Sequence, residues 1–244
     1  MEIAPGVHRI GHAHVNCYLV EGDDGRLLLV DTGLPRAWRA IGTAIRAIGR
    51  RPHDLAAVVL THAHFDHTGN AARAVSRGLP VWVSDADAYL AAHPYRYAHE
   101  NPRAAYPLRH PAAVPILLAM AAAGALWVRG VDDIRRLPAG EVLDVPGRPH
   151  VLPTPGHTAG HVALHLPDRD TLLTGDALVT LDPYTGGRGP QIIAGAATAH
   201  SAQALRSLDV LEASGATVVL PGHGEPWLGG IGPAVAAARA VGAH

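Results

Sequence analysis

The chain has one cysteine, no lysine, one phenylalanine and no apolar run long enough to cross a membrane as an untilted helix. A single cysteine excludes both a disulfide framework and a cysteine-rich zinc module. Twenty basic residues, all arginine, nearly balance 21 acidic residues, and this neutral charge argues against a nucleic-acid-binding protein. Charged residues make up 17% and apolar residues 48%, which is typical of a globular protein and not of a disordered one.

The length of 244 residues permits one large domain or two small ones, and we expect a single domain over residues 1–244. No basic segment followed by an apolar run opens the chain, so no signal peptide is predicted and a cytoplasmic location is expected. The longest uncharged stretch, Pro111–Val128, is interrupted by Pro115 and Gly124 and is predicted to be a buried or pocket-covering helix. We therefore expect a small-molecule substrate, no membrane and no nucleic acid.

Turn signals alternate with apolar runs, which predicts an α/β fold built as a sandwich. Val15–Val20 and Arg26–Val30 are predicted to form a hairpin around the turn Gly22–Gly25. Further strands are predicted at Ala56–Leu60, Pro80–Val83, Glu141–Val145, His150–Leu152, Val162–Leu166, Thr171–Leu173 and Thr217–Leu220, and helices at Arg36–Gly49, Asn70–Arg77 and Ser201–Glu212 with Ser201 as N-cap.

Residues 85–136 differ in character, with repeated His-Pro, Asn-Pro and Tyr-Pro pairs before the apolar stretch Ile116–Val128. We predict a mostly helical insertion. Its apolar and aromatic side chains could cover the functional site, and such a cover would favour an apolar or aromatic substrate. They could equally form the interface of a homodimer. Both arrangements would bury an exposed apolar patch.

A weak internal repeat links the two halves of the chain. The segment Leu27–Asp31 is similar to Thr171–Asp176, and Ala57–His62 is similar to Thr217–His223. In each half a strand ends in an aspartate, a helix follows, and a second strand ends in a histidine. Such halves would bring their aspartate and histidine residues to one shared site.

Seventeen histidines are present, and the densest group follows a predicted buried strand in the sequence Thr61-His62-Ala63-His64-Phe65-Asp66-His67. His62 and His64 are two residues apart, so in extended backbone they project to the same side. Asp66 and His67 follow as the chain turns into the next helix. Imidazole and carboxylate groups in this arrangement can bind two adjacent cations of zinc, iron, manganese or nickel, and zinc is the commonest in hydrolytic sites.

Three later elements each place a metal-binding side chain beside glycine near a strand end, where the backbone can approach a buried site. They are Thr154-Pro155-Gly156-His157, Thr174-Gly175-Asp176 and Pro221-Gly222-His223-Gly224. An isolated buried histidine is more often a hydrogen-bonded core residue than a ligand, but the clustering of these residues favours a metal site.

Together with Val30-Asp31-Thr32-Gly33, these elements resemble, in order, those of the metallo-β-lactamase-fold superfamily, which includes glyoxalase II and lactonases. The resemblance extends from about Asn16 to His223. It implies a four-layer αβ/βα sandwich with the metals at one edge and with the helical insertion described above.

The resemblance also implies the ligands of each metal. One cation would be held by His62, His64 and His157, and a second by Asp66, His67 and His223, with Asp176 bridging the two. Asp31 matches an aspartate that lies beneath the site and supports the ligand loops, although a turn or helix cap would explain it equally well.

The implied activity is that of a dinuclear zinc hydrolase, with iron or manganese as other metals, in which metal-bound hydroxide cleaves an ester, thioester or lactone without a covalent intermediate. Asp66 or Asp176 would handle the proton. Three alternatives stay open: a mononuclear iron persulfide dioxygenase, a β-lactamase-type amide hydrolase and a non-catalytic metal-binding protein.

The sequence says less about the substrate. Many lactonases of this superfamily have a tyrosine three residues after the bridging aspartate, where this chain has Val179. The nearby loop Asp182–Arg188 offers Tyr184 and Arg188, which we predict to be substrate-binding residues. An ordinary glycine-rich surface loop is the competing interpretation.

Overall fold

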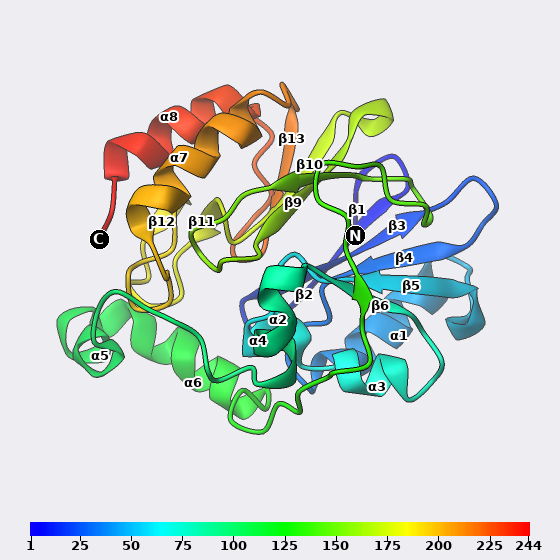
Figure 1. Ribbon diagram of the computed structural model, residues 1–244, viewed down its shortest axis with the longest axis horizontal. Coiled ribbons are helices and arrows are strands. Elements are labelled where there is room, and N and C mark those ends of the chain that lie inside the picture. The colour runs from blue at the N-terminus through cyan, green and yellow to red at the C-terminus, as the bar shows by residue number, and fades with distance from the viewer.

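The computed structural model describes residues 1–244, and in it two β-sheets pack face to face with helices on both outer sides (Figure 1). The first sheet has seven strands in chain order: β1 (Glu2–Ala4), β2 (Val7–His12), β3 (Val15–Glu21), β4 (Leu27–Val30), β5 (Leu55–Val59), β6 (Val81–Val83) and β7 (Arg135–Arg136). The second sheet has the order β13 (Val218–Pro221), β10 (Thr171–Gly175), β9 (Val162–Leu166), β8 (His150–Pro153). A two-stranded ribbon joins β11 (Val179–Leu181) and β12 (Arg188–Gln191).

The alternation of side chains along β4 explains the layered arrangement. Leu27 and Leu29 pack with the helices on the outer face of the first sheet, whereas Leu28 and Val30 pack into the core between the two sheets. All four residues are buried, so both faces of the strand are covered, which fits the continuous apolar run in the sequence. Each buried leucine stabilises the fold by about 1.5–3 kcal/mol. The predicted four-layer αβ/βα sandwich is therefore confirmed.

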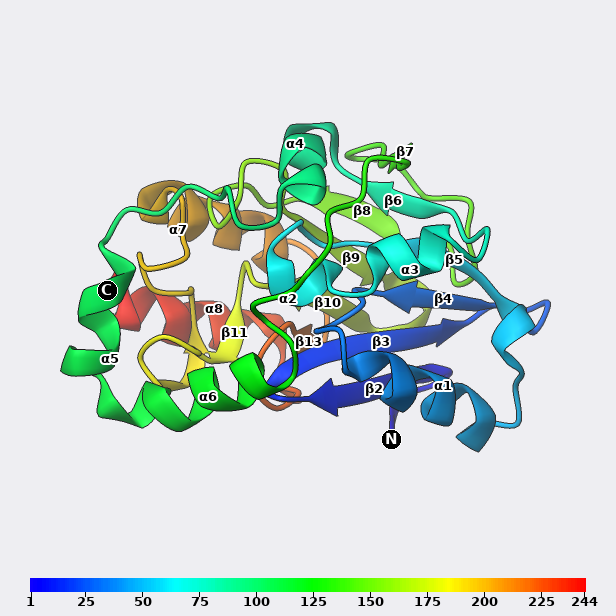
Figure 2. The same ribbon diagram turned by 90° about the horizontal axis from the view of Figure 1, so that it is seen from below.

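Helices form the two outer layers. On the first sheet lie α1 (Ala37–Ala47) and α3 (Ala71–Val75), and on the second sheet lie α7 (Ser201–Glu212) and α8 (Ile231–Val241), at opposite sides of the molecule (Figure 2). In α1 the buried residues Ala37, Ile41 and Ile45 recur every four positions, which places them on the face that meets the sheet. The short helix α2 (Phe65–Thr68) begins directly after His64.

The segment 85–136, predicted as a helical insertion, contains the helices α4 (Ala88–Ala92), α5 (Tyr106–Arg109) and α6 (Val114–Ala122) and three short 3₁₀ turns, joined by irregular chain, and its last two residues form β7. In α6, Ile116 and Met120 pack in one cluster with Val15 and Leu34. The helix ends before Gly124, whose φ of +101° few other residues adopt. Large apolar side chains stay exposed on the outer side of the insertion, namely Leu108, Leu118, Leu126 and Trp127, and the homodimer stays a prediction.

Two local predictions are wrong. Glu141–Val145 is not a strand but an irregular segment with a single bridge from Val142 to His150, because Pro146 and the left-handed Gly147 turn the chain back at once. Ser201 is not the N-cap of α7, since the ring of His200 accepts the hydrogen bond from Gln203 N. No helix is long and apolar enough to pass through a bilayer.

Candidate metal centre

Two pairs of parallel strands bring the repeated residues together. In the first sheet β4 lies beside β5, and in the second sheet β10 lies beside β13, both in parallel register. Asp31 and His62 therefore follow neighbouring strand ends, as do Asp176 and His223. The two sheets face each other, so these four residues meet at one edge of the sandwich, as the repeat in the sequence predicted.

All seven residues predicted as ligands gather at this edge in three overlapping buried groups. Candidate ligand atoms within a group lie no more than 4.8 Å apart. The groups are His62, His64 and His157; His62, His67 and Asp176; and Asp66, His67 and His223.

Asp176 lies at the centre of the cluster. One carboxylate oxygen is 3.4 Å from His157 Nε2 and 3.3 Å from His223 Nε2, and the other is 3.5 Å from His67 Nε2. On the far side, Asp66 Oδ2 is 3.3 Å from His223 Nε2. Asp176 is therefore within reach of both sets of histidines.

The unpaired atoms of the cluster fit metal ions. Eight buried side-chain nitrogen or oxygen atoms in the protein have no hydrogen-bond partner, and five of them belong to this cluster. They are Nε2 of His62, His64, His67 and His157, and Oδ1 of Asp176. Buried polar atoms are nearly always satisfied, and neutral imidazole with carboxylate is a donor set suited to zinc or iron. The donors and their orphaned atoms thus match a pair of divalent cations.

Hydrogen bonds on the outer side of the rings aim these nitrogens inward. His67 Nδ1 donates to Asp31 Oδ2 at 2.9 Å, and His223 Nδ1 donates to the backbone oxygen of His14 at 2.8 Å. His157 Nδ1 lies 3.2 Å from Thr198 Oγ1. Partners of this kind fix the ring orientation of metal-binding histidines.

Asp31 has the supporting position expected from the resemblance. Besides His67, its carboxylate accepts hydrogen bonds from the backbone nitrogen and the hydroxyl of Thr61, at 2.8 and 2.9 Å. Asp31 has a φ of +58°, a strained conformation that such a network can maintain. The residue thereby connects the strand before His62 to the helix that carries His67.

The backbone at position 222 lies so close to the cluster that only glycine fits there. A Cβ atom there would lie 2.1 Å from Asp176 Oδ1 and 2.9 Å from His67 Cε1, so any side chain would displace the cluster. This agrees with the prediction that glycines beside the histidines admit the backbone to the site.

Without metal ions, two histidines of the cluster bind protons more tightly than free histidine does. Although burial opposes the shift, Asp176 and Asp66 raise the pKa of His223 to about 10, and Asp176, Asp31 and Asp66 raise the pKa of His67. Burial lowers the pKa of His64 to about 3. The carboxylates thus require positive charge at the positions where cations would bind.

The metal-free protein is expected to lose stability as the pH falls from about 6.5 towards 3. Burial is the main reason that His64, His157 and His161 each have a pKa of about 3. The unfolded chain binds these protons near pH 6.5 and the folded chain only near pH 3, so acidification favours unfolding. Urea unfolding of the chelator-treated protein between pH 4 and 8 checks this, and a midpoint independent of pH would contradict it.

Two residues whose hydrogen bonds hold the loops of the cluster lie outside the sequence prediction. Asp87 is buried and accepts hydrogen bonds from Ala63 N at 3.0 Å, Thr158 Oγ1 at 2.8 Å and Gly160 N at 2.8 Å, so it joins the loops of three ligands. His161 Nε2 accepts a hydrogen bond from the backbone nitrogen of Asp176 at 2.9 Å. His161 was recognisable from its place four residues after His157, whereas no local pattern marks Asp87.

The two residues predicted to bind substrate, Tyr184 and Arg188, lie in different surroundings in the structure. Tyr184 is mostly buried, and its hydroxyl is 3.1 Å from the hydroxyl of Tyr97, whose ring centre is 4.3 Å from that of His64. Arg188 is exposed, makes no side-chain hydrogen bond or ion pair, and lines a surface hollow with Arg9 and Glu225. Only Tyr184 is thus joined to the cluster through a direct chain of contacts.

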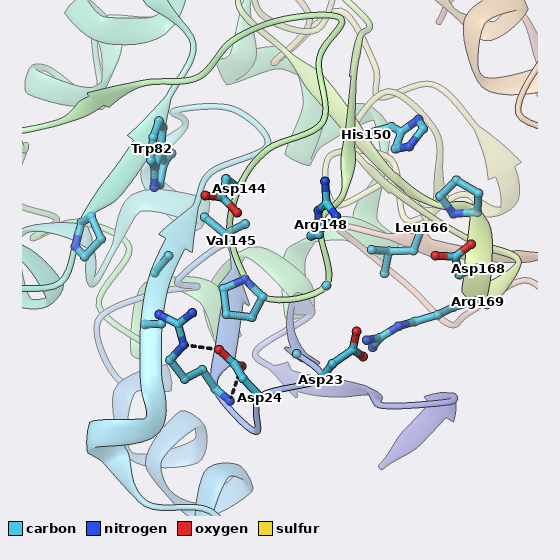
Figure 3. Close-up of a pocket in the computed structure, with 18 of the residues that line it drawn as sticks. Asp23, Asp24, Trp82, Asp144, Val145, Arg148, His150, Leu166, Asp168 and Arg169 are labelled. Atoms are coloured by element: carbon cyan, nitrogen blue, oxygen red, sulfur yellow. Dashed lines mark hydrogen bonds and ion pairs between the residues drawn. The ribbon is translucent and has the colours of Figure 1, made fainter.

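A large hollow of about 650 Å³ lies at the opposite edge of the sandwich (Figure 3). It is lined by the β3–β4 turn and by the starts of β5 and β6, whereas the cluster follows the strand ends. Its charged residues include Asp24, which forms an ion pair with Arg26, and also Asp144, Arg148, Asp168 and Arg169. None of the seven cluster residues borders this hollow.

The sequence pattern of the metallo-beta-lactamase superfamily matches residues 10–223, and the chain belongs to that superfamily. Within this superfamily the chain has a buried His/Asp cluster of the binuclear metal-site type, and relatives that match most of its length are named as probable metallo-hydrolases.

Several relatives resemble the chain over nearly its whole length. It is 27% identical to the protein named "Probable metallo-hydrolase YflN" of Bacillus subtilis, across 93% of this chain and 87% of that protein. The metallo-beta-lactamase family protein TTHA1429 from Thermus thermophilus is 28% identical, with a TM-score of 0.68 over 97% of this chain and 80% of that one. TTHA1623, solved in a di-iron-bound form, is 27% identical, with a TM-score of 0.61 over 95% and 96%.

Proposed function

We propose that this protein is a dinuclear zinc hydrolase that cleaves an ester, thioester or lactone bond in a small molecule. The observation that carries the proposal is the position of Asp176 between the two sets of histidines, within 3.5 Å of ring nitrogens from both. A carboxylate shared in this way is suited to hold two cations close together. The di-iron form of TTHA1623 supports a two-metal site in a relative and makes iron the principal alternative to zinc.

The donors divide into two sets. His62, His64 and His157 would hold one cation, Asp66, His67 and His223 would hold the other, and Asp176 would contact both. Two bound divalent cations supply Lewis acidity, which polarises a carbonyl group and lowers the pKa of water towards 7.

The carboxylates of Asp66 and Asp176 are the proton acceptors that the site offers. Asp66 is only 6% exposed and its carboxylate lies 3.3 Å from His223 Nε2. The neighbouring histidines hold the pKa of Asp66 below its usual value although burial opposes this, so the group is ionised at neutral pH. An ionised carboxylate can accept a proton from water and pass it to the leaving group.

Tyr184 and Tyr97 supply a hydrogen-bond donor. Two hydroxyl groups that share one hydrogen bond leave one proton for a third acceptor. Burial raises the pKa of both tyrosines, so both stay protonated at neutral pH. We assign Tyr184 to the stabilisation of negative charge on the substrate, and Arg188, because it is exposed, to the attraction of substrate from solvent.

Metal content tests the proposal. The protein is purified without added metal and measured by mass spectrometry, and about two zinc ions per chain are expected. The zinc-loaded protein is then assayed with esters, thioesters, lactones and β-lactams. About one iron per chain would redirect the assay to persulfide oxygenation, and no metal after reconstitution would overturn the proposal.

Replacing Tyr184 by Phe is expected to lower kcat/KM by about 10²-fold, because the substitution removes one hydrogen-bond donor and little volume. Steady-state kinetics on any substrate found in the panel measures the effect. Tyr89→Phe is the matched control, since Tyr89 is 64% exposed on α4. Equal kcat/KM in Tyr184→Phe and wild type would exclude Tyr184 from the site.

A further inference from the structure

Arg103 is a fixed guanidinium group beside the metal centre. It begins the 3₁₀ turn Arg103–Ala105 of the insertion, and its guanidinium carbon lies 3.8 Å from the centre of the Tyr97 ring. One terminal nitrogen donates to the backbone oxygen of Tyr97 at 3.2 Å. The stacking and the hydrogen bond both come from Tyr97, so the orientation of the guanidinium is tied to that residue.

The charge of Arg103 has no partner within the protein. No carboxylate forms an ion pair with it, and its Nε is buried without a hydrogen-bond acceptor. The nearby Glu100 is occupied elsewhere, since its carboxylate accepts hydrogen bonds from the backbone nitrogen and hydroxyl of Ser201. Arginine does not deprotonate in proteins, so this guanidinium keeps a positive charge that no carboxylate of the protein balances, and the position favours an anionic ligand.

Tyr97 links this cation to the metal centre. Its ring contacts Arg103 and lies 4.3 Å from the ring of His64, while its hydroxyl is 3.1 Å from that of Tyr184. Arg103 therefore stands one aromatic ring away from the cluster, a distance that a small substrate can span.

We infer, on the basis of the proposed hydrolase function, that Arg103 is a specificity-determining residue that binds a carboxylate of the substrate. The planar guanidinium fork matches the two oxygens of a carboxylate. The substrate class is then an ester, thioester or lactone that carries a carboxylate away from the bond that is cleaved. Tyr97 positions the guanidinium, and Tyr184 contacts the same substrate closer to the metals.

Calorimetric titration with two probes tests this inference. Monoethyl glutarate carries a carboxylate, and ethyl glutaramate replaces that carboxylate with a neutral amide of similar shape. The zinc-loaded wild-type protein is expected to bind the carboxylate probe about tenfold more tightly than the amide. In Arg103→Met this preference should vanish, and in Arg103→Lys it should return in part, because lysine restores the charge without the fork.

Arg109→Met is the matched control, since Arg109 is exposed on α5 and makes no side-chain hydrogen bond or ion pair. It should retain the wild-type preference. Zinc content and circular dichroism verify folding, and Arg103→Gln replaces Arg103→Met if the latter does not fold.

Two results would overturn the inference. One is equal or absent binding of the probes by the wild-type protein. The other is a carboxylate preference that survives in Arg103→Met, which would mean that the carboxylate binds to the metals. Either result leaves the proposed hydrolase function standing, whereas that function fails if the metal-loaded protein hydrolyses nothing in the substrate panel.

Discussion

Replacing Asp176 by Ala is expected to remove about one metal ion per chain and to lower kcat/KM by about 10³-fold or more. The carboxylate lies within 3.8 Å of the Nε2 atoms of His62, His67, His157 and His223. Its loss leaves these imidazoles without the central negative charge that balances the cations, and removes the one group that both donor sets share. Mass spectrometry of the purified variant and steady-state kinetics measure the two effects.

Two further variants separate the effect of the Asp176 charge from general effects of substitution. Asp176→Asn keeps the shape and one carbonyl oxygen but loses the charge, so an intermediate metal content is expected. Asp168→Ala is the control, because Asp168 is exposed in the turn before β10 and forms no hydrogen bond through its side chain. An Asp176→Ala protein that keeps two metals and full turnover would refute the bridging role.

Replacing Asp87 by Ala is expected to lower the free energy of unfolding by about 2–5 kcal/mol and to weaken metal binding by about 10–100-fold. Asp87 accepts hydrogen bonds from the backbone nitrogens of Ala63 and Gly160 and from the hydroxyl of Thr158. The substitution leaves two buried N–H groups without acceptors. It also separates the loop that carries His62 and His64 from the loop that carries His157.

Urea unfolding and competition with a zinc chelator measure these two consequences of the Asp87 substitution. Asp85→Ala is a close control, because Asp85 is two residues away and its ion pair with Arg136 is exposed, so its removal should change stability by less than about 1 kcal/mol. If Asp87→Ala matches Asp85→Ala in both measurements, then Asp87 does not join the ligand loops.

Much of the site was predictable from the sequence because its signal is local. His62, His64, Asp66 and His67 lie within six positions, and their spacing after a buried strand already indicates a metal site. His157, Asp176 and His223 are separate in sequence, but each stands beside glycine near a strand end. The alternation of apolar residues likewise predicted most strands of the two sheets and the long helices α1 and α7.

Other elements carry weak local signals and were missed. In β2, Arg9 and Gly11 interrupt the apolar pattern, and the strand forms because it pairs with β3 along its whole length. The ribbon of β11 and β12 was also missed, because only its pairing stabilises such short strands.

The sequence by itself determined the family, the layered α/β architecture and which residues form the buried His/Asp cluster, because strand periodicity and ligand spacing are encoded over a few consecutive positions. The tertiary structure alone decided which groups support and surround that centre. Asp87 meets Gly160 across 73 positions, and Tyr97 meets Tyr184 across 87. Contacts over such separations depend on how the insertion packs against the sandwich, and no short stretch of sequence contains that information.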